Sequence, residues 1–376
     1  MHMMTTPRIC LCMIVKNEEK VLARALQSVR SLIDYWVICD TGSTDATPAI
    51  VLDNLTGIPG ELHRVEWVNF GHNRTQVLGM AREKADYLLI MDADMVVRVQ
   101  GDFKHKLHLD YYEIRYEGPL DYTQPMLLSG GHHWQYVGVT HEYLYADTAH
   151  TWGFLPELSL YHLADGGMRA DKYERDIQLL TDALQQTPGD LRSMFYLAQS
   201  YRDIGRPAEA LHWYRERIAG GVGWQEEHWY AQYQVGMMLQ QSGAEWPFVL
   251  EAFLEAHAAR PSRLEPVYQI IKHYRETENY RMGYHFFSQM AHPISYPATD
   301  RLFIEKPVYE YLMALEHGVC ACGIGRTAES LSSFEHILQF NPLPDWVRES
   351  AERGRALAHS ILYPDTTTTE PCIPAP

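Results

Sequence analysis

The first hundred residues alternate short apolar runs with helical stretches, and this alternation limits the possible folds more than any other feature. The apolar runs predict strands at residues 8–15, 35–39, 62–68 and 87–94. Helices are predicted between these strands, at residues 17–33, 48–55 and 71–85. In the first of them, apolar residues recur at helical spacing. Strands that alternate with helices favour βαβ units, so we expect a mainly parallel sheet with helices on both faces.

The second half of the chain is predicted to be helical, and small and aromatic residues recur there at matching offsets. The separation between Tyr201 and Tyr274 equals that between Ala210 and Gly283. This spacing resembles that of tetratricopeptide helix-turn-helix repeats. The chain is therefore expected to hold a sheet domain, an all-α repeat domain and a disordered Pro- and Thr-rich tail, at residues 1–170, 171–362 and 363–376.

Composition excludes several classes of function. The chain has 376 residues, of which 46% are hydrophobic, and its formal net charge is -16. Such an acidic chain is a poor candidate for binding duplex nucleic acid or an anionic membrane, because both need a basic face. No apolar run approaches the roughly 18 residues of a membrane span. The six cysteines are scattered, so we expect reduced thiols and a cytoplasmic protein.

Two aspartates interrupt the last predicted strand, in the run YLLIMDADMVV. If the strand continues, Asp92 and Asp94 face the same side, near its carboxyl end. Paired carboxylates repel each other unless a cation or a proton lies between them. Magnesium and manganese are commonly held by one or two carboxylates together with phosphate oxygens. The pair therefore predicts a metal site that holds a phosphate, and the alternative is a solvated turn.

Other predicted strands also end in polar loops. Asn17 and Glu18 follow the first strand, and Asp40 follows the second. Ligands of open α/β sheets bind outside the carboxyl ends of the strands, so these loops are candidates for nucleotide contacts. For Asp40, the alternative is a turn or a helix cap.

Four segments together resemble family 2 glycosyltransferases of the GT-A fold. They read MIVKNEE, CDTGSTDAT, NFGHNRTQVLGMA and LLIMDADM, in the family's order. Thr41 and Thr75 stand where the family usually has Asp and Asn. The resemblance implies a Rossmann-like GT-A domain, here followed by an all-α tetratricopeptide-like domain. The branch that combines the two includes peptide S- and O-glycosyltransferases.

The resemblance also implies roles for individual residues. Asn17, Glu18 and Asp40 would contact the nucleotide base. Arg74 would approach the base or the diphosphate. Asp92 would face the ribose or the metal, and Asp94 would coordinate the metal.

The segment 129–167 supplies candidates for the catalytic half of the site. Its pattern W-x-Y-x-G-x-x-H-E is similar to one in the same branch of the family. Trp134 and Tyr136 are expected to stack on a sugar or to pack in the core. His141 and Glu142 are the candidate catalytic pair, with Glu142 as the base that deprotonates the acceptor. The structural alternative for Glu142 is a salt bridge or a contact that supports His141.

A late histidine completes the predicted metal site. GT-A enzymes often add a histidine ligand after the D-x-D motif, and His162 stands in a similar place, at the end of a short predicted strand. Imidazole suits manganese better than magnesium. The expected cofactor is therefore Mn²⁺ or Mg²⁺, held by Asp92, Asp94 and His162.

The resemblance implies a metal-dependent, inverting glycosyltransferase that uses a nucleotide-diphosphate sugar, with UDP-sugars the commonest donors. The acceptor is expected to be a peptide, a protein, a glycan or a small molecule. The repeats are expected to recruit this acceptor or to form a homodimer. Two alternatives stand beside this prediction: a non-catalytic tetratricopeptide scaffold, and a sugar-phosphate nucleotidyltransferase. The latter usually has a Gly-rich loop after its first strand, whereas this chain has KNEEK.

Overall fold

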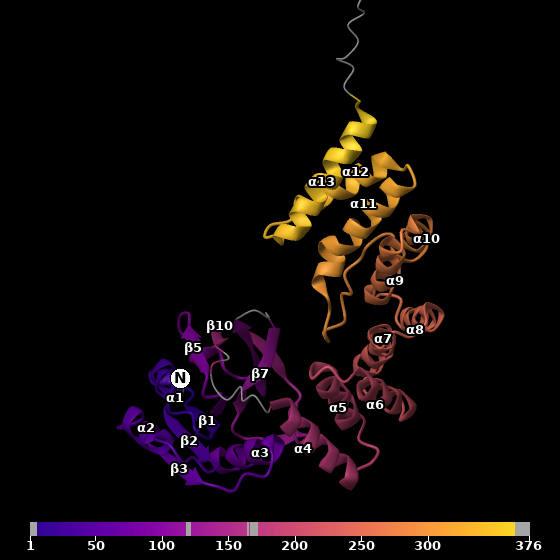
Figure 1. The fold of residues 1–376 in the computed structure, drawn as a ribbon. Coiled ribbons are helices and arrows are strands. Elements are labelled where there is room, and N and C mark those ends of the chain that lie inside the picture. Colours follow the sequence, from indigo (N-terminus) through magenta and orange to yellow (C-terminus); the bar gives the residue numbers. More distant parts are fainter. Residues whose placement is uncertain (1–5, 118–121, 164, 166–171, 365–376) are drawn as a thin grey trace, which may run out of the picture. The chain divides into compact units, whose positions relative to one another are not determined.

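The chain forms two compact units in the computed structural model, which describes residues 6–117, 122–163, 165 and 172–364 (Figure 1). The units are Met1–Pro188 and Gly189–Pro376. Their division lies later than residue 170, because helix α4 (Lys172–Gln186) belongs with the sheet unit. All but two residues of the predicted tail, 363–376, lie outside the described residues.

The first unit is built on an eight-stranded sheet in the order β3-β2-β1-β4-β7-β6-β10-β5. Strands β3, β2, β1 and β4 are parallel, as are β6 and β10, while β7 and β5 run antiparallel to their neighbours. The strands are β1 (Ile9–Val15), β2 (Tyr35–Asp40), β3 (Gly60–Arg64), β4 (Tyr87–Ile90), β5 (Met95–Val99), β6 (Tyr111–Glu117), β7 (Tyr122–Ser129) and β10 (Trp152–His162). A short 3-10 helix, Lys104–Lys106, follows β5.

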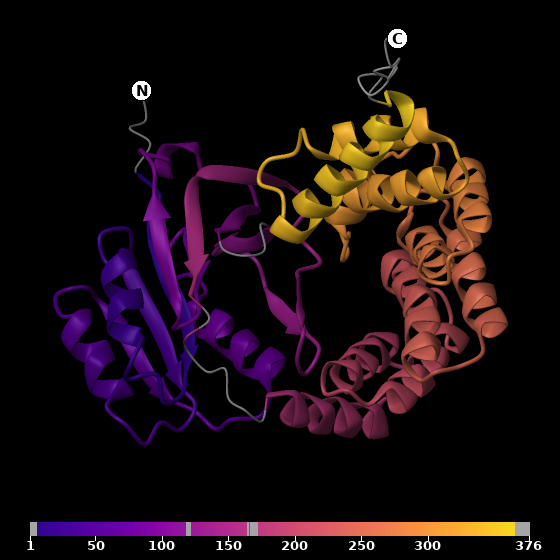
Figure 2. The same cartoon turned by 45° about the horizontal axis from the view of Figure 1, so that its top comes forward.

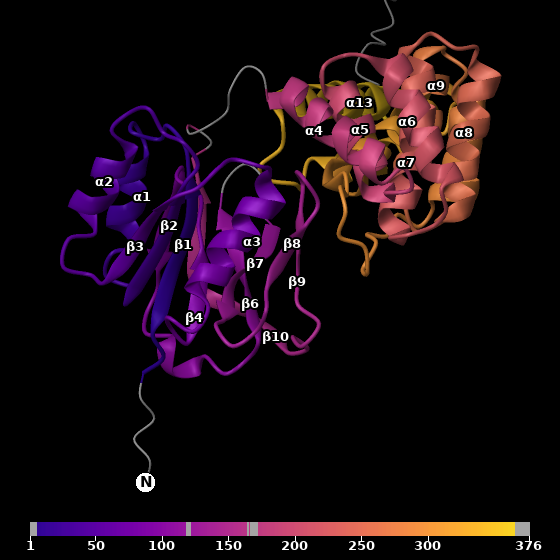
Figure 3. The ribbon, with the colours of Figure 1, turned by 90° about the horizontal axis from the view of Figure 1, so that it is seen from below.

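Helices cover both faces of this sheet, as the βαβ pattern predicts. Figure 3 shows α1 (Leu22–Val29) and α2 (Thr47–Asn54) on one face and α3 (Phe70–Ala81) on the other. Right-handed crossovers explain this placement, because β1 leads outward to β2 and β3, and the chain then returns to β4 on the other side of β1. The predicted α/β class is confirmed.

Several element bounds differ from those predicted. The first helix occupies Leu22–Val29 rather than 17–33, because residues 16–21 form turns that follow β1. Strand β3 ends at Arg64, since its neighbour β2 ends at Asp40. Strand β4 ends at Ile90, so Asp92 and Asp94 lie in the turn before β5 and not in a continuing strand.

The strand order reverses direction at β1, and this reversal positions a site. Ligands of open α/β sheets bind where the connections leave neighbouring strands in opposite directions. Val15 ends β1 opposite Asp40 of β2, and Cys12 pairs with Ile90 at the end of β4. The polar loops that follow these three strands therefore meet at one edge of the sheet.

A small hairpin packs on α3 near this edge. Its strands are β8 (Gln135–Val137) and β9 (Tyr143–Tyr145). Gly71 lies against it so closely that a Cβ there would lie 2.0 Å from the carbonyl oxygen of Gly138. Glycine at position 71 therefore permits this approach of α3 to the hairpin.

The second unit is a series of paired helices, side by side in Figure 2. Consecutive helices pack on one another, and the small and aromatic positions noted in the sequence lie between them. A Cβ on Gly236 of α7, for example, would lie 2.5 Å from the Phe253 ring of α8. The helices are α5 (Leu191–Asp203), α6 (Pro207–Ala219), α7 (Gln225–Gln241), α8 (Trp246–Ala259), α9 (Glu265–Glu276), α10 (Tyr280–Phe286), α11 (Met313–Gly323), α12 (Thr327–Ile337) and α13 (Asp345–Leu362), with π-helical turns at Phe287–Ala291 and Val308–Leu312. The helical repeat prediction is confirmed.

A buried ionic cluster fixes the long connection between α10 and α11. Arg263 and Glu265 are fully buried and their charged atoms lie 2.8 Å apart. Arg263 also donates to the carbonyl of Leu302, and Arg260 pairs with Asp300. Each buried charge thus has a partner, as burial of an ion requires. No helix among the described residues combines the length and apolar character of a membrane span.

Two glycines of α3 provide a matched test of the hairpin contact. We expect Gly71→Ala to lower the free energy of unfolding by about 2 kcal/mol or more, because the new methyl overlaps backbone that cannot rotate away. Gly79→Ala meets nothing within 4 Å and is expected to stabilise the helix by about 0.5–1 kcal/mol. Hydrogen exchange of the α3 amides measures both effects. Equal effects of the two substitutions would contradict the close contact.

Candidate active site

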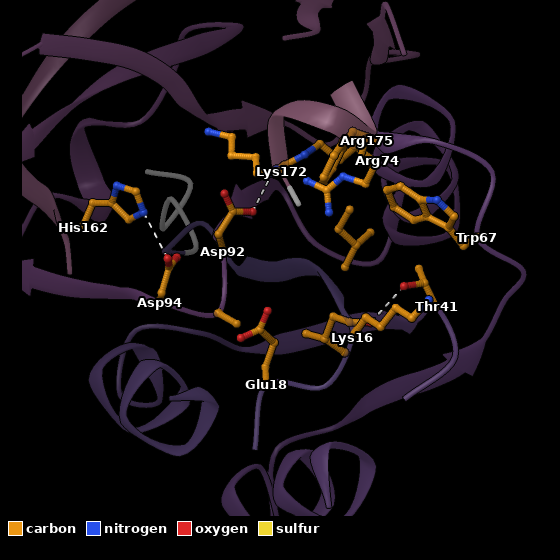
Figure 4. Close-up of a pocket in the computed structure, with 14 residues that line it drawn as sticks. Lys16, Glu18, Thr41, Trp67, Arg74, Asp92, Asp94, His162, Lys172 and Arg175 are labelled. Atoms are coloured by element: carbon orange, nitrogen blue, oxygen red, sulfur yellow. Dashed lines mark hydrogen bonds and ion pairs between the residues drawn. The ribbon is translucent and has the colours of Figure 1, made fainter. Parts of the chain in front are cut away.

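A cavity of about 360 Å³ lies at the edge of the sheet where β1 and β4 end. Figure 4 shows the side chains that line it. Carboxylates come from Glu18, Asp92 and Asp94, and Arg74 enters from α3. Of the predicted site residues, the structure brings these four and His162 into one cavity.

Arg74 connects two carboxylates from different parts of the chain. Its Nη2 donates a hydrogen bond of 2.7 Å to Oδ1 of Asp92. Its Nε lies 2.9 Å from Oε1 of Glu142, as an ion pair without hydrogen-bond alignment. The side chains of Arg74 and Glu142 are only 17% and 12% exposed, so solvent screens this contact weakly. The helix, the turn after β4 and the loop before β9 are thus tied together by one guanidinium.

The charge of Arg74 is secured by its surroundings. Burial alone disfavours the charge, but Asp92, Tyr136 and Glu142 together raise the pKa of Arg74. The guanidinium carbon also lies 5.7 Å from the centre of the Tyr136 ring, a cation–π distance. Burial raises the pKa of the Tyr136 phenol, which therefore stays neutral behind Arg74.

His162 and Asp94 form a second polar pair in the cavity. His162 Nε2 lies 3.1 Å from Oδ2 of Asp94, and the hydrogen bond between them raises the pKa of His162. The sheet register explains this contact, because β10 runs antiparallel to β5 and pairs His162 with Met95, the residue after Asp94. His162 therefore lies beside the Asp-x-Asp turn, as predicted.

The three predicted metal ligands do not form a ready-made cluster. Within the described ranges, no group of three or more His, Cys, Asp or Glu side chains is arranged to hold a metal ion. Asp92 is engaged by Arg74, whereas Asp94 and His162 converge. A carboxylate and an imidazole are suitable ligands for manganese, which commonly completes its shell with phosphate oxygens. The residues present therefore fit a metal that arrives with a phosphate-bearing ligand.

The predicted nucleotide contacts divide into two groups. Glu18 lines the cavity, and its backbone N–H donates to Thr47 Oγ1 at 2.7 Å. Asn17 has a left-handed backbone, φ 55°, and its side chain accepts from the Thr44 N–H. Asp40 is buried and accepts from the Ser43 N–H at 2.9 Å. Asn17 and Asp40 therefore shape the two loops, and neither side chain lines the cavity.

Trp134 lies in the core, so its assignment as a sugar contact is corrected here. It is 6% exposed, and its indole N–H donates to the carbonyl of Ser129 at 2.8 Å. Its ring packs edge-on against Tyr111, on the neighbouring strand β6. The satisfied indole and the buried ring leave no face for a ligand. Tyr136 backs Arg74 and does not line the cavity either.

His141 and Glu142 stand on the loop between β8 and β9. His141 has a left-handed backbone, φ 49°, which is uncommon for a residue other than glycine. Its Nε2 lies 3.8 Å from Oδ2 of Asp176, a buried carboxylate on α4. Asp176 also accepts from Thr140 Oγ1, and burial raises the pKa of Asp176. Helix α4 thus holds the loop that carries the candidate base.

Sequence reasoning missed several residues that line the cavity. Trp67 and Phe70 stand at the start of α3, with ring centres 4.9 Å apart, and Lys16 follows β1. Lys172 and Arg175 come from α4. Lys16 lies inside the MIVKNEE motif, so position could have indicated it. Nothing in the helical pattern of α4 distinguishes its two cations from surface charges.

Comparison with known proteins agrees with this geometry. Residues 10–103 match the sequence model of the family described as "Glycosyl transferase family 2". A glycosyltransferase of the SPbeta prophage of Bacillus subtilis, SunS, is 23% identical over 231 residues, which are 57% of this chain and 54% of that protein. A TPR repeat-containing protein of Synechococcus elongatus is 38% identical over 107 residues, 28% of this chain and 25% of that protein.

The chain thus spans about half the length of the first of these relatives and a quarter of the second. Among solved structures, the C-terminal part of a TPR repeat-containing protein from Cytophaga hutchinsonii is 16% identical with a TM-score of 0.41, over 53% of this chain and 69% of that one. YrrB, described as a TPR protein with an unusual peptide-binding site, is 13% identical with a TM-score of 0.38, over 50% of this chain and 87% of that one.

The sheet unit contains a family 2 glycosyltransferase domain, and a tetratricopeptide-like helical repeat region follows it. The family match covers helix α3, which bears Arg74, and the loops that bear Glu18, Asp92 and Asp94. The helix pairing of the second unit, rather than its likeness to solved structures, defines the repeat region.

The double contact of Arg74 predicts the effect of a conservative substitution. Lysine carries one point charge and cannot reach Asp92 and Glu142 from the same position as the guanidinium fork. We expect Arg74→Lys to lower the opening free energy of α3 and β4 by about 2 kcal/mol, as measured by hydrogen exchange. Arg98→Lys, in an exposed pair with Glu117, is the control and is expected to change stability by less than about 0.5 kcal/mol. Indistinguishable protection in the two variants would show that Arg74 holds nothing together.

Proposed function

We propose that this chain is a metal-dependent, inverting glycosyltransferase that takes a sugar from a nucleoside-diphosphate donor. One observation carries the proposal: an aspartate pair and an arginine from the segment that matches family 2 glycosyltransferases line one cavity with a later histidine, at the carboxyl ends of β1 and β4. Acidic side chains alone would suit a cation, and basic ones alone would suit an anion. A metal together with a diphosphate needs both.

Asp94 and His162 are the residues that would hold Mn²⁺ or Mg²⁺, with Asp92 beside them. A divalent ion bound there supplies positive charge that stabilises the departing diphosphate. Asp92, engaged by Arg74, is positioned to accept from a ribose hydroxyl or to reach the metal. Glu18 and the adjacent loops, shaped by Asn17 and Asp40, would border the nucleotide.

The chain's own residues account for the rest of the reaction. When the C1–O bond to the diphosphate breaks, negative charge develops on the leaving phosphate. Arg74, already fixed in the cavity, places a permanent positive charge to stabilise it. The acceptor attacks C1 from the opposite face, and a base takes its proton. Glu142 is the proposed base. It does not itself line the cavity, and in the described structure it forms an ion pair with Arg74, which does line it.

The donor class and the acceptor follow from the same proposal. UDP-sugars are the proposed donors, and a peptide or protein side chain is the proposed acceptor. The paired helices of the second unit offer the repeated surface by which tetratricopeptide arrays bind extended peptides or a second copy of themselves. We assign recruitment of the acceptor, or homodimer formation, to this unit.

Binding of the nucleotide tests the donor site directly. UDP, GDP and dTDP are each titrated by calorimetry into the full chain, with and without Mn²⁺. We expect one of them, UDP first, to bind in a manganese-dependent manner. We expect Asp94→Ala to weaken that binding at least tenfold, about 1.4 kcal/mol, because it removes a charged metal ligand.

A matched control separates the site from general charge effects. Asp102→Ala also removes one aspartate, and its side chain is 79% exposed, outside the cavity. It is expected to bind as the unsubstituted chain does. Failure of all three nucleotides to bind a folded chain would overturn the donor site and favour the non-catalytic scaffold.

A further inference from the structure

Two cations reach the cavity from a helix outside the family match. Helix α4 begins at Lys172, whereas the match to family 2 glycosyltransferases ends at residue 103. Lys172 and Arg175, one turn apart on this helix, both line the cavity. Figure 4 shows them on the same side of Asp92 as Arg74, across the cavity from Glu18. The family resemblance assigns no role to either residue.

Arg175 is held in place without using all of its hydrogen-bond donors. Its guanidinium carbon lies 5.2 Å from the centre of the Phe70 ring, a cation–π distance, at the cavity wall. Its Nε is buried and has no hydrogen-bond partner in the described structure. The nearest carboxylate oxygen, Oδ1 of Asp176, is 3.9 Å away. The buried Nε therefore lies within the wall, and the atoms of the same side chain that line the cavity are the ones that a ligand there would meet.

Lys172 is likewise available to a ligand. Within the part of the chain that the structure describes, no carboxylate forms an ion pair with its ammonium group, which lies 5.6 Å from the Tyr173 ring. The carboxylates deeper in the cavity have other cationic partners: Arg74 for Asp92, and His162 for Asp94. In the described structure neither cavity aspartate forms an ion pair with Lys172 or Arg175, and the carboxylate nearest to Arg175 is that of Asp176, the next residue on α4.

The gathering of cations at one cavity stands out in a chain with a net charge of -16. Scattered cations on an acidic protein are normally paired at the surface, as Arg24 is with Asp165. Here two of them share one wall of a cavity that also holds Arg74. An anion with several charges, held by a point charge and a planar fork together, fits such a wall.

We propose that Lys172 and Arg175 bind the phosphate groups of the donor, which makes α4 a part of the donor site. The proposal rests on the proposed function, since it names the residues that receive the donor's diphosphate. Asp176, the next residue, contacts Thr140 and His141, on the loop that carries Glu142. The same turn of α4 thus faces the donor phosphates and holds the loop of the candidate base.

The test uses a probe that needs no knowledge of the base or the sugar. Inorganic pyrophosphate with Mn²⁺ is titrated by calorimetry into the full chain and into Lys172→Met, Arg175→Gln and the double variant. UDP, GDP and dTDP with Mn²⁺, and uridine, guanosine and thymidine alone, are titrated in parallel. We expect the double variant to bind pyrophosphate and the preferred diphosphate at least tenfold more weakly. Binding of the matching nucleoside is expected to stay within twofold.

Two further variants separate charge from packing. Arg8→Gln removes one positive charge at the opposite end of β1, where Arg8 is 62% exposed, and is expected to bind as the unsubstituted chain does. Arg175→Lys keeps the charge but not the planar guanidinium beside Phe70, and is expected to recover part of the affinity lost in Arg175→Gln. Equal losses in Arg175→Lys and Arg175→Gln, with Lys172→Met unchanged, would show a packing role and overturn the proposal.

The remaining outcomes distinguish this inference from the proposed function. In one outcome the unsubstituted chain binds a nucleoside diphosphate and Asp94→Ala abolishes this binding, but the affinity of the double α4 variant stays within twofold. This outcome overturns the α4 assignment alone. If the folded, unsubstituted chain binds neither pyrophosphate nor any of the three nucleotides, both proposals fall. Thermal unfolding of each variant confirms its fold. If the double variant does not fold, the single variant Lys172→Met decides. A threefold or greater loss of pyrophosphate affinity in this variant supports the proposal, and no loss of affinity overturns it.

Discussion

The contact of Arg74 with Asp92 and Glu142 joins the three parts of the candidate site. The arginine is on α3, the aspartate lies in the turn after β4, and the glutamate lies on the loop between β8 and β9. These segments are far apart in sequence, and the parallel sheet alone would leave the hairpin unattached. Gly71 allows α3 to approach this hairpin at backbone distance, so the ion pair forms inside a shielded interface. In such surroundings an ion pair is effective because little water competes for either charge.

A cavity with both signs of charge follows from this arrangement. Asp94 and His162 lie together on one side of the cavity and suit a cation. Arg74, Lys172 and Arg175 also line the cavity and suit an anion. A metal and a diphosphate have opposite charges, and a site that binds them together must match each on its own side. In the second unit, the buried charges of Arg263 and Glu265 pair with each other, so they are structural.

The local pattern of the chain predicted much of this architecture. Alternating strands and helices indicated a parallel sheet, and the polar loops after β1, β2 and β4 indicated its functional edge. Recurring small and aromatic residues indicated the repeats, as Gly236 against Phe253 illustrates. The predicted bounds were less accurate. The run through Asp92 and Asp94 reads as one strand, yet it breaks after Ile90 because the chain turns there into β5.

The sequence by itself thus determined the fold class, the edge that carries the site and the site's acidic residues with Arg74 and His162, because periodic burial and turn chemistry are local properties. Tertiary structure decided which of these side chains meet. The antiparallel pairing of β10 with β5 brings His162 to Asp94, and packing against Tyr111 withdraws Trp134 into the core. The direction of α4 turns Lys172 and Arg175 into the cavity. Strand register and helix direction depend on contacts between distant segments, and no local spacing encodes them.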